Sequence, residues 1–396
     1  MFTIQTLDKI SAKGLELFPR DQYEIATEIS NPDAIILRST KIHDMELPPK
    51  LKAIARAGAG VNNIPIDKCT KKGIVVFNTP GANANAVKEL VLAALLLASR
   101  KIHDGISWAQ SLKGNGDQVP ALVEKGKSQF KGPEIKGKTL GVIGLGAIGV
   151  MVANDALALG MNVIGYDPFI SINSAWELSS NVAKASSLDH LLSVSDYITI
   201  HVPFNENTNG MINKNTLKIM KKGVRILNFA RGGLVDNKDI LEAIENGKVA
   251  CYVTDFPEEE LLGNERIIAI PHLGASTPES EENCALMAAS QLREFLEKGN
   301  VRNSVNYANC ELPFSGDTRI ISAHDNIPNM LGQITTILAQ NNYNIADMIS
   351  KNKDKTGYTI VDVNGKVSPD IIEKIKAVSG INMVNVIDIS NGKNSD

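Results

Sequence analysis

Short, mostly apolar runs alternate along this chain with longer stretches in which apolar residues recur at helical spacing. Runs rich in Val, Ile and Leu and bounded by polar or glycine-rich segments are typical of buried parallel strands. They cover Ala34–Leu37, Ala53–Ala57, Val75–Asn78, Leu140–Gly144, Val163–Tyr166, Tyr197–His201, Arg225–Phe229 and Ile267–Ile270. The alternation with helical segments predicts doubly wound α/β units with parallel sheets.

One predicted strand leads directly into a glycine-rich turn and then a helix. Gly144 would make the tight turn, Gly146 would let the backbone approach a pyrophosphate, and Gly149 would let the helix pack on the strand. The N–H groups at Ala147 and Ile148, at the start of the helix, would face the phosphates. This context predicts a Rossmann-type dinucleotide site.

An acidic residue follows the next predicted strand and indicates which dinucleotide binds. Asp167 lies 18 residues after Gly149, where a carboxylate can bind the ribose hydroxyls of the adenosine. Its charge would repel a 2′-phosphate, so the sequence favours NAD over NADP.

The rest of the chain predicts further domains on either side of this unit. An α/β block and a long apolar helix, Val87–Arg100, precede it, and Gly114–Gly137 is rich in Gly and Lys, which indicates a flexible stretch. After a helix at Pro278–Lys298 and a turn at Pro313–Gly316, a compact βαββαβ pattern predicts a ferredoxin-like domain. Its strands are expected at Arg319–His324, Ile345–Lys351, Thr356–Asn364 and Met383–Ile389, and its helices at Met330–Asn341 and Asp370–Val378.

Composition excludes several classes of function. The net charge of −3 gives no global basic field for nucleic acid. The most apolar run, Leu90–Ala98, is far below the roughly 20 residues that span a bilayer. The first residues show no secretory signal. The four cysteines match no zinc spacing, so we expect reduced thiols, no metal and a cytoplasmic protein.

Polar residues follow several of the predicted strands, at the sheet edge where ligands of α/β proteins bind. Arg231 can orient a carboxylate and polarise a neighbouring carbonyl. His272 can take or return a hydroxyl proton, and a carboxylate from Asp255–Glu260 can hold its tautomer. Together these groups fit hydride transfer at a 2-hydroxy acid, with His272 accepting the hydroxyl proton while the hydride passes to NAD.

Motifs around these residues resemble those of the D-isomer-specific 2-hydroxyacid dehydrogenase family. They are Gly144–Gly149, His201-Val-Pro203, Asn228-Phe-Ala-Arg-Gly-Gly233 and Pro271-His-Leu-Gly-Ala-Ser-Thr277. The resemblance covers nearly the whole chain. It implies a flavodoxin-like substrate-binding domain from residues 1–98 and 274–313, an NAD-binding Rossmann domain from 99–273, and a regulatory ACT domain from 318–396.

The same resemblance assigns roles to individual residues. Arg231, a glutamate of the acidic run and His272 would be catalytic. Alignment on Phe256-Pro257 selects Glu259 and alignment on Asp255 selects Glu260; we adopt Glu259 because it needs no gap. Further cofactor contacts are implied at His201, Pro203, Thr208, Ala230 and Asp255, and substrate contacts at Arg38, Ser39, Ala59, Gly60 and Asn83.

The resemblance further implies D-3-phosphoglycerate as the substrate, with Lys125 and Lys127 as further candidate cations for its phosphate. In the ACT-like module, His324, Asn326 and Asn344 match positions that bind L-serine as an effector in regulated members of the family. The family usually has Gly where Asn329 stands. Asn tolerates φ > 0, which would keep the turn, but its side chain could block the amino-acid pocket. The alternatives are another D-2-hydroxy acid, such as D-lactate, glycerate or a hydroxyglutarate, or a non-catalytic NADH sensor. The family implies a homodimer or homotetramer.

Overall fold

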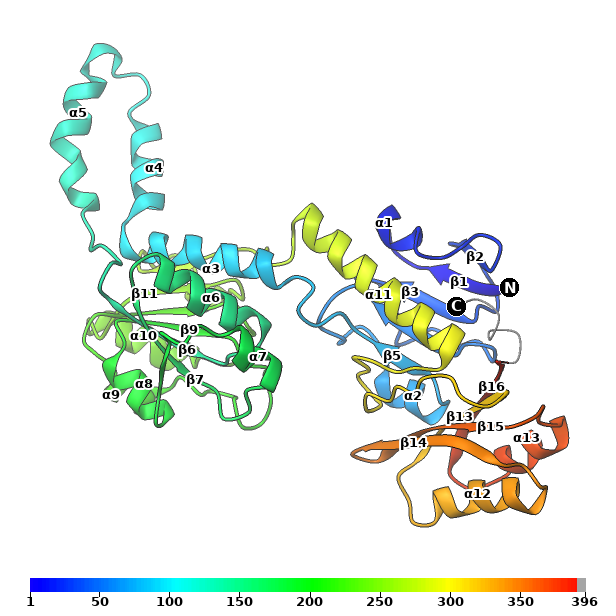
Figure 1. The fold of residues 1–396 in the computed structure, drawn as a ribbon. Coiled ribbons are helices and arrows are strands. Elements are labelled where there is room, and N and C mark those ends of the chain that lie inside the picture. Colours follow the sequence, from blue (N-terminus) through cyan, green and yellow to red (C-terminus); the bar gives the residue numbers. More distant parts are fainter. Residues whose placement is uncertain (390–396) are drawn as a thin grey trace. The chain divides into compact units, whose positions relative to one another are not determined.

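The computed structural model describes residues 1–389 and divides into two compact units. Unit 1 combines Met1–Asn83 with the chain from Glu281 onward, and unit 2 is Ala84–Ser280 (Figure 1). Each unit has its own parallel sheet, and each is described by itself.

Unit 1 contains a parallel five-stranded sheet in the order β2-β1-β3-β4-β5, which is the flavodoxin-like order expected for the substrate-binding domain. The first helix of the unit, α1, is only four residues long. Apolar residues of α11 pack on one face of the sheet, and Cys69 of α2 packs on the other. The elements are β1 (Phe2–Thr6), α1 (Ala12–Leu15), β2 (Tyr23–Ala26), β3 (Ala34–Leu37), β4 (Ala53–Arg56), α2 (Ile66–Lys71), β5 (Val75–Phe77) and α11 (Pro278–Lys298).

Two strands of this sheet, β1 and β2, were not among the predicted strands. β1 mixes polar Thr and Gln with apolar residues and is only half-buried. β2 is a short edge strand in which Tyr23 is the buried residue. Neither therefore shows the continuous apolar run of β3, β4 and β5.

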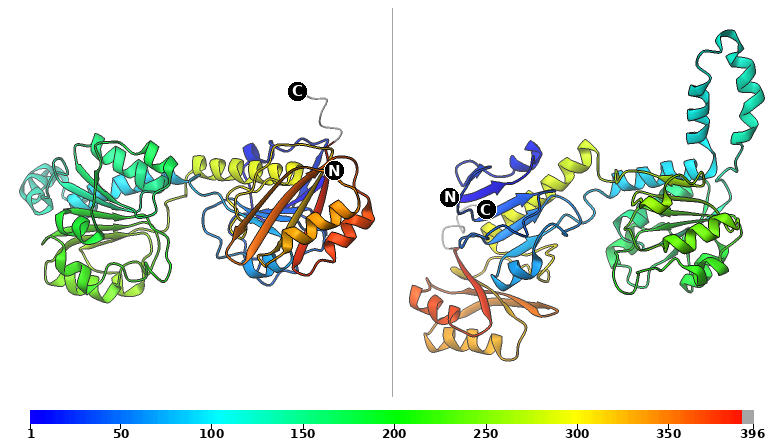
Figure 2. Two further views of the ribbon diagram at one scale, coloured as in Figure 1. Left: turned by 60° about the horizontal axis from the view of Figure 1, so that its bottom comes forward. Right: turned by 180° about the vertical axis from the view of Figure 1, so that it is seen from behind.

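Unit 2 contains a parallel seven-stranded sheet in the order β12-β11-β10-β9-β6-β7-β8, which confirms the Rossmann-type prediction. The strand order reverses between β6 and β9. Helices α3 and α6 cover one face, and α8, α9 and α10 cover the other (Figure 2). The strands are β6 (Thr139–Ile143), β7 (Asn162–Tyr166), β8 (Ala183–Lys184), β9 (Tyr197–Ile200), β10 (Val224–Asn228), β11 (Val249–Thr254) and β12 (Ile267–Ala269). The helices that accompany them are α3 (Ala84–Ser99), α6 (Ala147–Ala158), α7 (Ile172–Glu177), α8 (Leu188–Val194), α9 (Lys214–Ile219) and α10 (Asn237–Glu245).

A helical arm projects from unit 2, and its second half falls within Gly114–Gly137, the stretch that the sequence predicted to be flexible (Figures 1 and 2). It consists of α4 (Ile102–Ser111) and α5 (Val119–Gly126), with 3-10 turns at Gly116–Gln118 and Lys127–Phe130. The rings of Trp108 and Phe130 lie 5.3 Å apart and tie its two sides together. Helix α5 was not predicted within Gly114–Gly137, because a helix with no buried residues lacks the apolar periodicity of a core helix.

The C-terminal part of unit 1 has the predicted βαββαβ order and an antiparallel sheet, β14-β15-β13-β16. Helices α12 and α13 cover one face of this sheet, through residues such as Ile334 and Ile375. We call this part the C-terminal module. Its elements are β13 (Thr318–Asp325), α12 (Met330–Gln340), β14 (Ile345–Lys353), β15 (Thr356–Val363), α13 (Pro369–Lys376) and β16 (Ile381–Asp388).

The other face of the module's sheet shares a core with the rest of unit 1. Ile321 and Tyr358 belong to the same apolar cluster as Phe295 of α11. Beside them, Arg319 and Asp362 form a fully buried ion pair, with Nε–Oδ1 and Nη2–Oδ2 distances of 2.7 Å. Arg319 also donates to the carbonyl oxygen of Lys298, at the end of α11. The module is therefore built into unit 1.

This division differs from the expected domain boundaries in the placement of α3 as well. Residues 84–99 group with unit 2, because α3 packs against α6, β10 and β11.

No helix among residues 1–389 is long and apolar enough to cross a membrane. All four cysteines are buried thiols.

Candidate functional site

The turn between β6 and α6 has the geometry that a dinucleotide requires. Gly144 has a φ of 90°, and a Cβ there would lie 2.5 Å from the carbonyl oxygen of His201. A Cβ on Gly149 would lie 2.0 Å from the carbonyl oxygen of Gly144. A Cβ on Gly146 would meet nothing within 4 Å, and Gly146 caps α6 without a side-chain hydrogen bond. The turn is thus tight inside and open at the start of α6, which fits a pyrophosphate.

Asp167 is fixed beside this turn by backbone hydrogen bonds. Its Oδ2 accepts from the N–H of Leu145 and its Oδ1 from the N–H of Phe169, both at 2.8 Å. The carboxylate is therefore held at the end of β7, where it can accept hydrogen bonds from ribose hydroxyls. With the open turn at Gly146, these residues fit NAD.

The loop after β9 carries His201. Because β9 is the neighbour of β6 at the point where the strand order reverses, this loop lies opposite the glycine turn. The Nε2 of His201 lies 2.9 Å from Thr199 Oγ1, and burial lowers the pKa of its imidazole to about 4. The ring is therefore neutral at physiological pH. Thr208 Oγ1 donates to the carbonyl oxygen of Pro203 at 2.7 Å and accepts from the N–H of Asn205 at 2.8 Å, which shapes the loop.

Arg231 is presented by a turn that the side chain of Asn228 holds together. Asn228 is buried at the end of β10, and its Nδ2 donates to the carbonyl oxygen of Arg231 at 2.8 Å. Its Oδ1 accepts from the N–H of Ala230 at 3.2 Å. The Arg231 side chain is exposed, and its Nη1 donates to Ala230 O at 2.7 Å. The turn thus holds the backbone of Arg231 and leaves its guanidinium at the surface, where it can receive an anion.

Asp255 is a buried carboxyl group at the end of β11. It is 2% exposed, and its Oδ1 has no hydrogen-bond partner among residues 1–389. Burial raises the pKa of this carboxyl to about 6, although the charge of Arg231 opposes the shift. Gly274 packs against it, since a Cβ there would lie 3.8 Å from Asp255 Oδ2.

His272 follows β12, and its exposed ring lies 4.7 Å from the ring of Phe256, centroid to centroid. The residues predicted from the sequence at this edge, Arg231, Asp255 and His272, thus all follow strands of one sheet at its carboxyl end. Glu258, Glu259 and Glu260 are exposed, and the last two open a 3-10 turn, Glu259–Leu261. The role of Glu259 beside His272 stays a prediction.

In unit 1, the residues after β3 are organised by a carboxylate that sequence reasoning missed. Asp8 Oδ2 accepts from the backbone N–H groups of Arg38 at 2.6 Å and of Ser39 and Thr40 at 3.1 Å. Burial opposes ionisation, but these hydrogen bonds hold the pKa of Asp8 below its usual value. The backbone that carries Arg38 and Ser39 is therefore fixed by a charged acceptor.

The glycine-rich turn after β4 is held by two side chains that were not predicted as site residues. Arg56 donates from Nε to the carbonyl oxygen of Arg38 at 2.9 Å and from Nη1 to that of Gly60. Asn78 Nδ2 donates to the carbonyl oxygen of Ala59 at 2.6 Å. With these carbonyls engaged, the turn can present its N–H groups to an anion. Arg56 is the last residue of β4, and Arg38 directly follows β3. This shared position at the end of a strand is the sequence signal that could have identified Arg56.

Asn83, the remaining predicted substrate contact, lies in the turn before α3. Lys125 and Lys127 lie in the helical arm, where Lys127 pairs with Glu124.

The predicted effector residues do not meet within one chain. His324 is 2% exposed, with Nδ1 2.8 Å from the carbonyl oxygen of Asp325 and Nε2 2.8 Å from Thr359 Oγ1. Asn326 lies at the same end of the sheet. Asn344 precedes β14 at the opposite end, because Ile345 pairs with Val363. The length of β13 separates the two ends by roughly 20 Å. Asn329 adopts φ 65°, as its tolerance of this conformation predicts.

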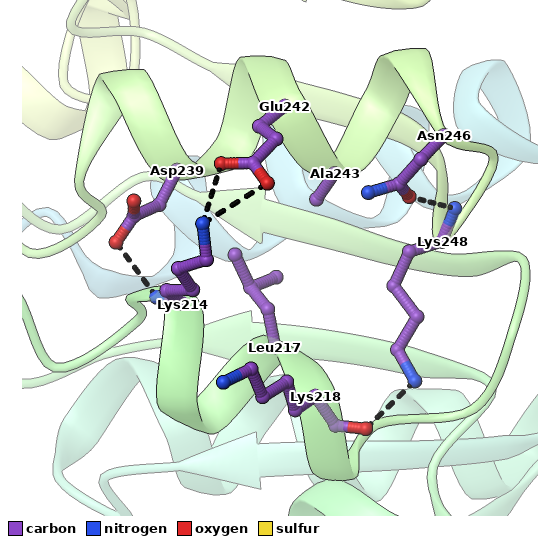
Figure 3. A pocket seen from close by; sticks show the side chains of 8 residues that line it. All are labelled: Lys214, Leu217, Lys218, Asp239, Glu242, Ala243, Asn246 and Lys248. Atoms are coloured by element: carbon purple, nitrogen blue, oxygen red, sulfur yellow. Dashed lines mark hydrogen bonds and ion pairs between the residues drawn. The ribbon is translucent and has the colours of Figure 1, made fainter.

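A separate pocket between α9 and α10 lies away from these strand ends and is lined by lysines (Figure 3). Lys214 Nζ is paired with Glu242 at 2.9 Å, and Lys248 Nζ donates to the carbonyl oxygen of Lys218 at 2.9 Å (Figure 3). These two ammonium groups are engaged by the pocket's own walls, so we do not assign the pocket to the cofactor.

Comparisons with known proteins agree with this geometry. Residues 92–274 match the model of the D-isomer specific 2-hydroxyacid dehydrogenase NAD-binding domain. The chain is 35% identical to D-3-phosphoglycerate dehydrogenase of Methanocaldococcus jannaschii, covering 94% of this chain and 69% of that protein. It is 38% identical to the enzyme of the same name from Archaeoglobus fulgidus, covering 78% of this chain and 58% of that protein.

Among solved structures, NAD⁺-bound 3-phosphoglycerate dehydrogenase of Entamoeba histolytica aligns with a TM-score of 0.60 and 27% identity. The alignment covers 77% of this chain and 98% of that one. Because the chain covers more than two thirds of the Methanocaldococcus enzyme at 35% identity, and because its glycine turn and Asp167 fit NAD, it belongs to the D-isomer specific 2-hydroxyacid dehydrogenase family.

Proposed function

We propose that this protein oxidises D-3-phosphoglycerate to 3-phosphohydroxypyruvate with NAD, the first step of L-serine biosynthesis. The observation that carries the proposal is the shared position of Arg231 and His272 at the carboxyl edge of the NAD-binding sheet. Similarity to D-3-phosphoglycerate dehydrogenases supports the choice of substrate. Because the chain spans 58–69% of the length of these two relatives, the activity of the whole protein is a proposal.

Each group at this edge has a defined role in the reaction. Arg231 would bind the substrate carboxylate and polarise the bond between C2 and its oxygen. His272 would accept the hydroxyl proton in oxidation and return it in reduction. Glu259 would orient His272 and stabilise its protonated form. Bound NAD supplies the acceptor for the hydride that leaves C2.

The edge of the five-stranded sheet would add further contacts to the anionic groups of the substrate. Arg38 and Arg56 lie at the ends of neighbouring strands, with Leu37 paired to Arg56 in the register of β3 and β4. A phosphorylated acid carries more negative charge than D-lactate or glycerate, and two arginines at one edge suit such a substrate. Ser39, Ala59, Gly60 and Asn83 would add hydrogen bonds.

The test follows NADH formation on mixing D-3-phosphoglycerate and NAD with the protein at alkaline pH, with a ketone trap. NADH formation is the expected result. NADH formation only with D-lactate, glycerate or a hydroxyglutarate would show that the substrate is that acid and not D-3-phosphoglycerate. Failure with every acid, by protein that still binds NADH, would favour the NADH sensor.

We further propose that the protein is a cytoplasmic homodimer or homotetramer that responds to L-serine. The arm supports association, because Ile106 of α4 is 58% exposed and Ile102 is 38% exposed. Since His324 and Asn344 lie at opposite ends of the module's sheet, a serine site that uses both would need two copies of the chain. Light scattering tests the assembly. Calorimetric titration with L-serine tests whether the protein binds this effector. Absence of binding heat would contradict the proposed serine site in the C-terminal module.

A further inference from the structure

The arginine expected to receive the substrate anion already holds a carboxylate supplied by the chain itself. Arg38 Nη1 lies 2.6 Å from Oε1 of Glu281, which stands in the first turn of α11. Both side chains are partly exposed, at 33% and 46%. A substrate anion that uses this guanidinium must therefore compete with Glu281.

The structure restricts this exchange to the arginine side chain. The N–H of Arg38 is bound by Asp8, and its carbonyl oxygen accepts from Arg56 and from Asn63 Nδ2 at 3.2 Å. The backbone at Arg38 is thus fixed from both sides. Exchange of the guanidinium between Glu281 and an incoming anion therefore falls to rotation of the Arg38 side chain on a fixed backbone.

The strength of the pair suits a contact that is made and broken in each turnover. Ion pairs between partly exposed side chains are weak, because water screens the charges and ordering of the long side chains opposes them. A phosphate or carboxylate with two acceptor oxygens can displace such a partner through bidentate hydrogen bonds. While Glu281 is nearby, however, its charge reduces the net attraction that Arg38 offers.

We propose that Glu281 sets the affinity of the protein for its anionic substrate by competing with it for Arg38. This inference depends on the proposed function, in which Arg38 binds the substrate. Glu281 acts through Arg38 and takes no part in hydride or proton transfer.

The adjacent residue offers a matched control on the same helix turn. Glu282 pairs with Lys13 at 2.6 Å, so Glu282→Gln removes the same charge from α11 and leaves the Arg38 contact in place. We would measure KM, and Kd by calorimetry, for D-3-phosphoglycerate with the full-length native protein, Glu281→Gln and Glu282→Gln. Glu281→Gln should lower both constants about two- to fivefold, the range of an exposed ion pair, and Glu282→Gln should not.

Two further measurements show whether Glu281 acts through Arg38 and through its charge. The effect of Glu281→Gln should disappear in an Arg38→Met background, and it should shrink in about 1 M NaCl, where charges are screened within about 3 Å. A higher KM in Glu281→Gln would mean that Glu281 orients Arg38 for the substrate, and would overturn the proposal. Equal changes in both Gln variants would also overturn it, because they would indicate a general effect of surface charge.

The native protein reports separately on the proposed function. If it oxidises a different D-2-hydroxy acid, the substrate assignment fails and the same variants are compared on that acid. If it binds and oxidises none of them, both proposals fail. If it oxidises D-3-phosphoglycerate and Glu281→Gln leaves KM and Kd unchanged, only the role of Glu281 fails.

Discussion

The two parallel sheets of this protein end in carboxyl edges of different chemical character. At the five-stranded edge, Arg38 and Arg56 are embedded in hydrogen bonds to backbone and carboxylate groups, and Asp8 is held ionised. At the seven-stranded edge, His272 is exposed, and Asp255 is buried with its pKa raised to about 6 by burial. The five-stranded edge thus keeps its groups charged, whereas the seven-stranded edge holds a carboxyl group whose pKa is raised toward neutrality.

The difference shows how one type of architecture divides the work of a reaction. Parallel strands deliver side chains to a common edge in both units, and the local hydrogen bonds decide what those side chains can do. A fixed cation suits binding of an anion, whereas proton transfer needs a group that titrates near the working pH. Changes at the five-stranded edge should therefore alter affinity, and changes at the seven-stranded edge should alter chemistry.

The largest effect is expected at the seven-stranded edge. His272→Asn removes the proposed base and should lower kcat about 10²- to 10⁴-fold, the usual contribution of a positioned proton acceptor. NAD affinity, measured by fluorescence titration of NADH, should be retained, because the glycine turn and Asp167 are unchanged. Turnover at the native rate would contradict the assignment of His272.

Next in size is the buried pair that joins the C-terminal module to α11. Arg319→Met leaves Asp362 as an uncompensated buried charge and should lower the free energy of unfolding by roughly 3–5 kcal/mol, measured by urea denaturation of the full chain. Arg319→Met combined with Asp362→Leu should recover much of the loss, since no lone charge remains. A single variant as stable as the native protein would show that the pair does not hold the module in unit 1.

A smaller effect is expected from the cation at the five-stranded edge. Arg38→Met removes charge-assisted hydrogen bonds to the substrate, which contribute about 1.5–3 kcal/mol, and should raise KM for D-3-phosphoglycerate roughly 10- to 100-fold. The control is Lys13→Met, which removes a cation that pairs with Glu282 on the same helix turn. If Arg38→Met mainly lowered kcat at an unchanged KM, the contrast between the edges would fail.

The last effect concerns stability alone and is a pH-dependent change at Asp255. Its pKa of about 6 in the folded protein lies above the ordinary 3.8, so the stability that it contributes is present below pH 3.8 and lost as the pH rises through 6. Asp255→Asn keeps the side chain neutral. It should therefore be about 3 kcal/mol more stable than the native protein at pH 8, with little difference near pH 4. Urea denaturation at both pH values measures this, and a constant difference would exclude titration of Asp255 as its cause.

Several features were predictable because they depend on local sequence. The glycine turn follows from steric limits at Gly144 and Gly149, and helix α11 was predicted with the bounds that the structure gives. Most of the buried strands were predictable because strands buried on both faces are continuously apolar, but β11 (Val249–Thr254), buried inside the seven-stranded sheet, was not predicted. The edge strand β2 and the helical arm lacked these signals, since neither buries much surface.

The sequence by itself determined the Rossmann-type unit, its preference for NAD, and the strand ends that carry Arg38, Arg231 and His272. These follow from short segments in which backbone sterics and apolar periodicity act over a few residues. Only the tertiary structure decided that Asp8 and Arg56 fix the backbone of Arg38 and that Glu281 pairs with its side chain. Glu281 is distant in sequence from Arg38, and such a contact depends on packing that no local pattern encodes. The same reason applies to the burial of Arg319 with Asp362, which makes the C-terminal module part of unit 1.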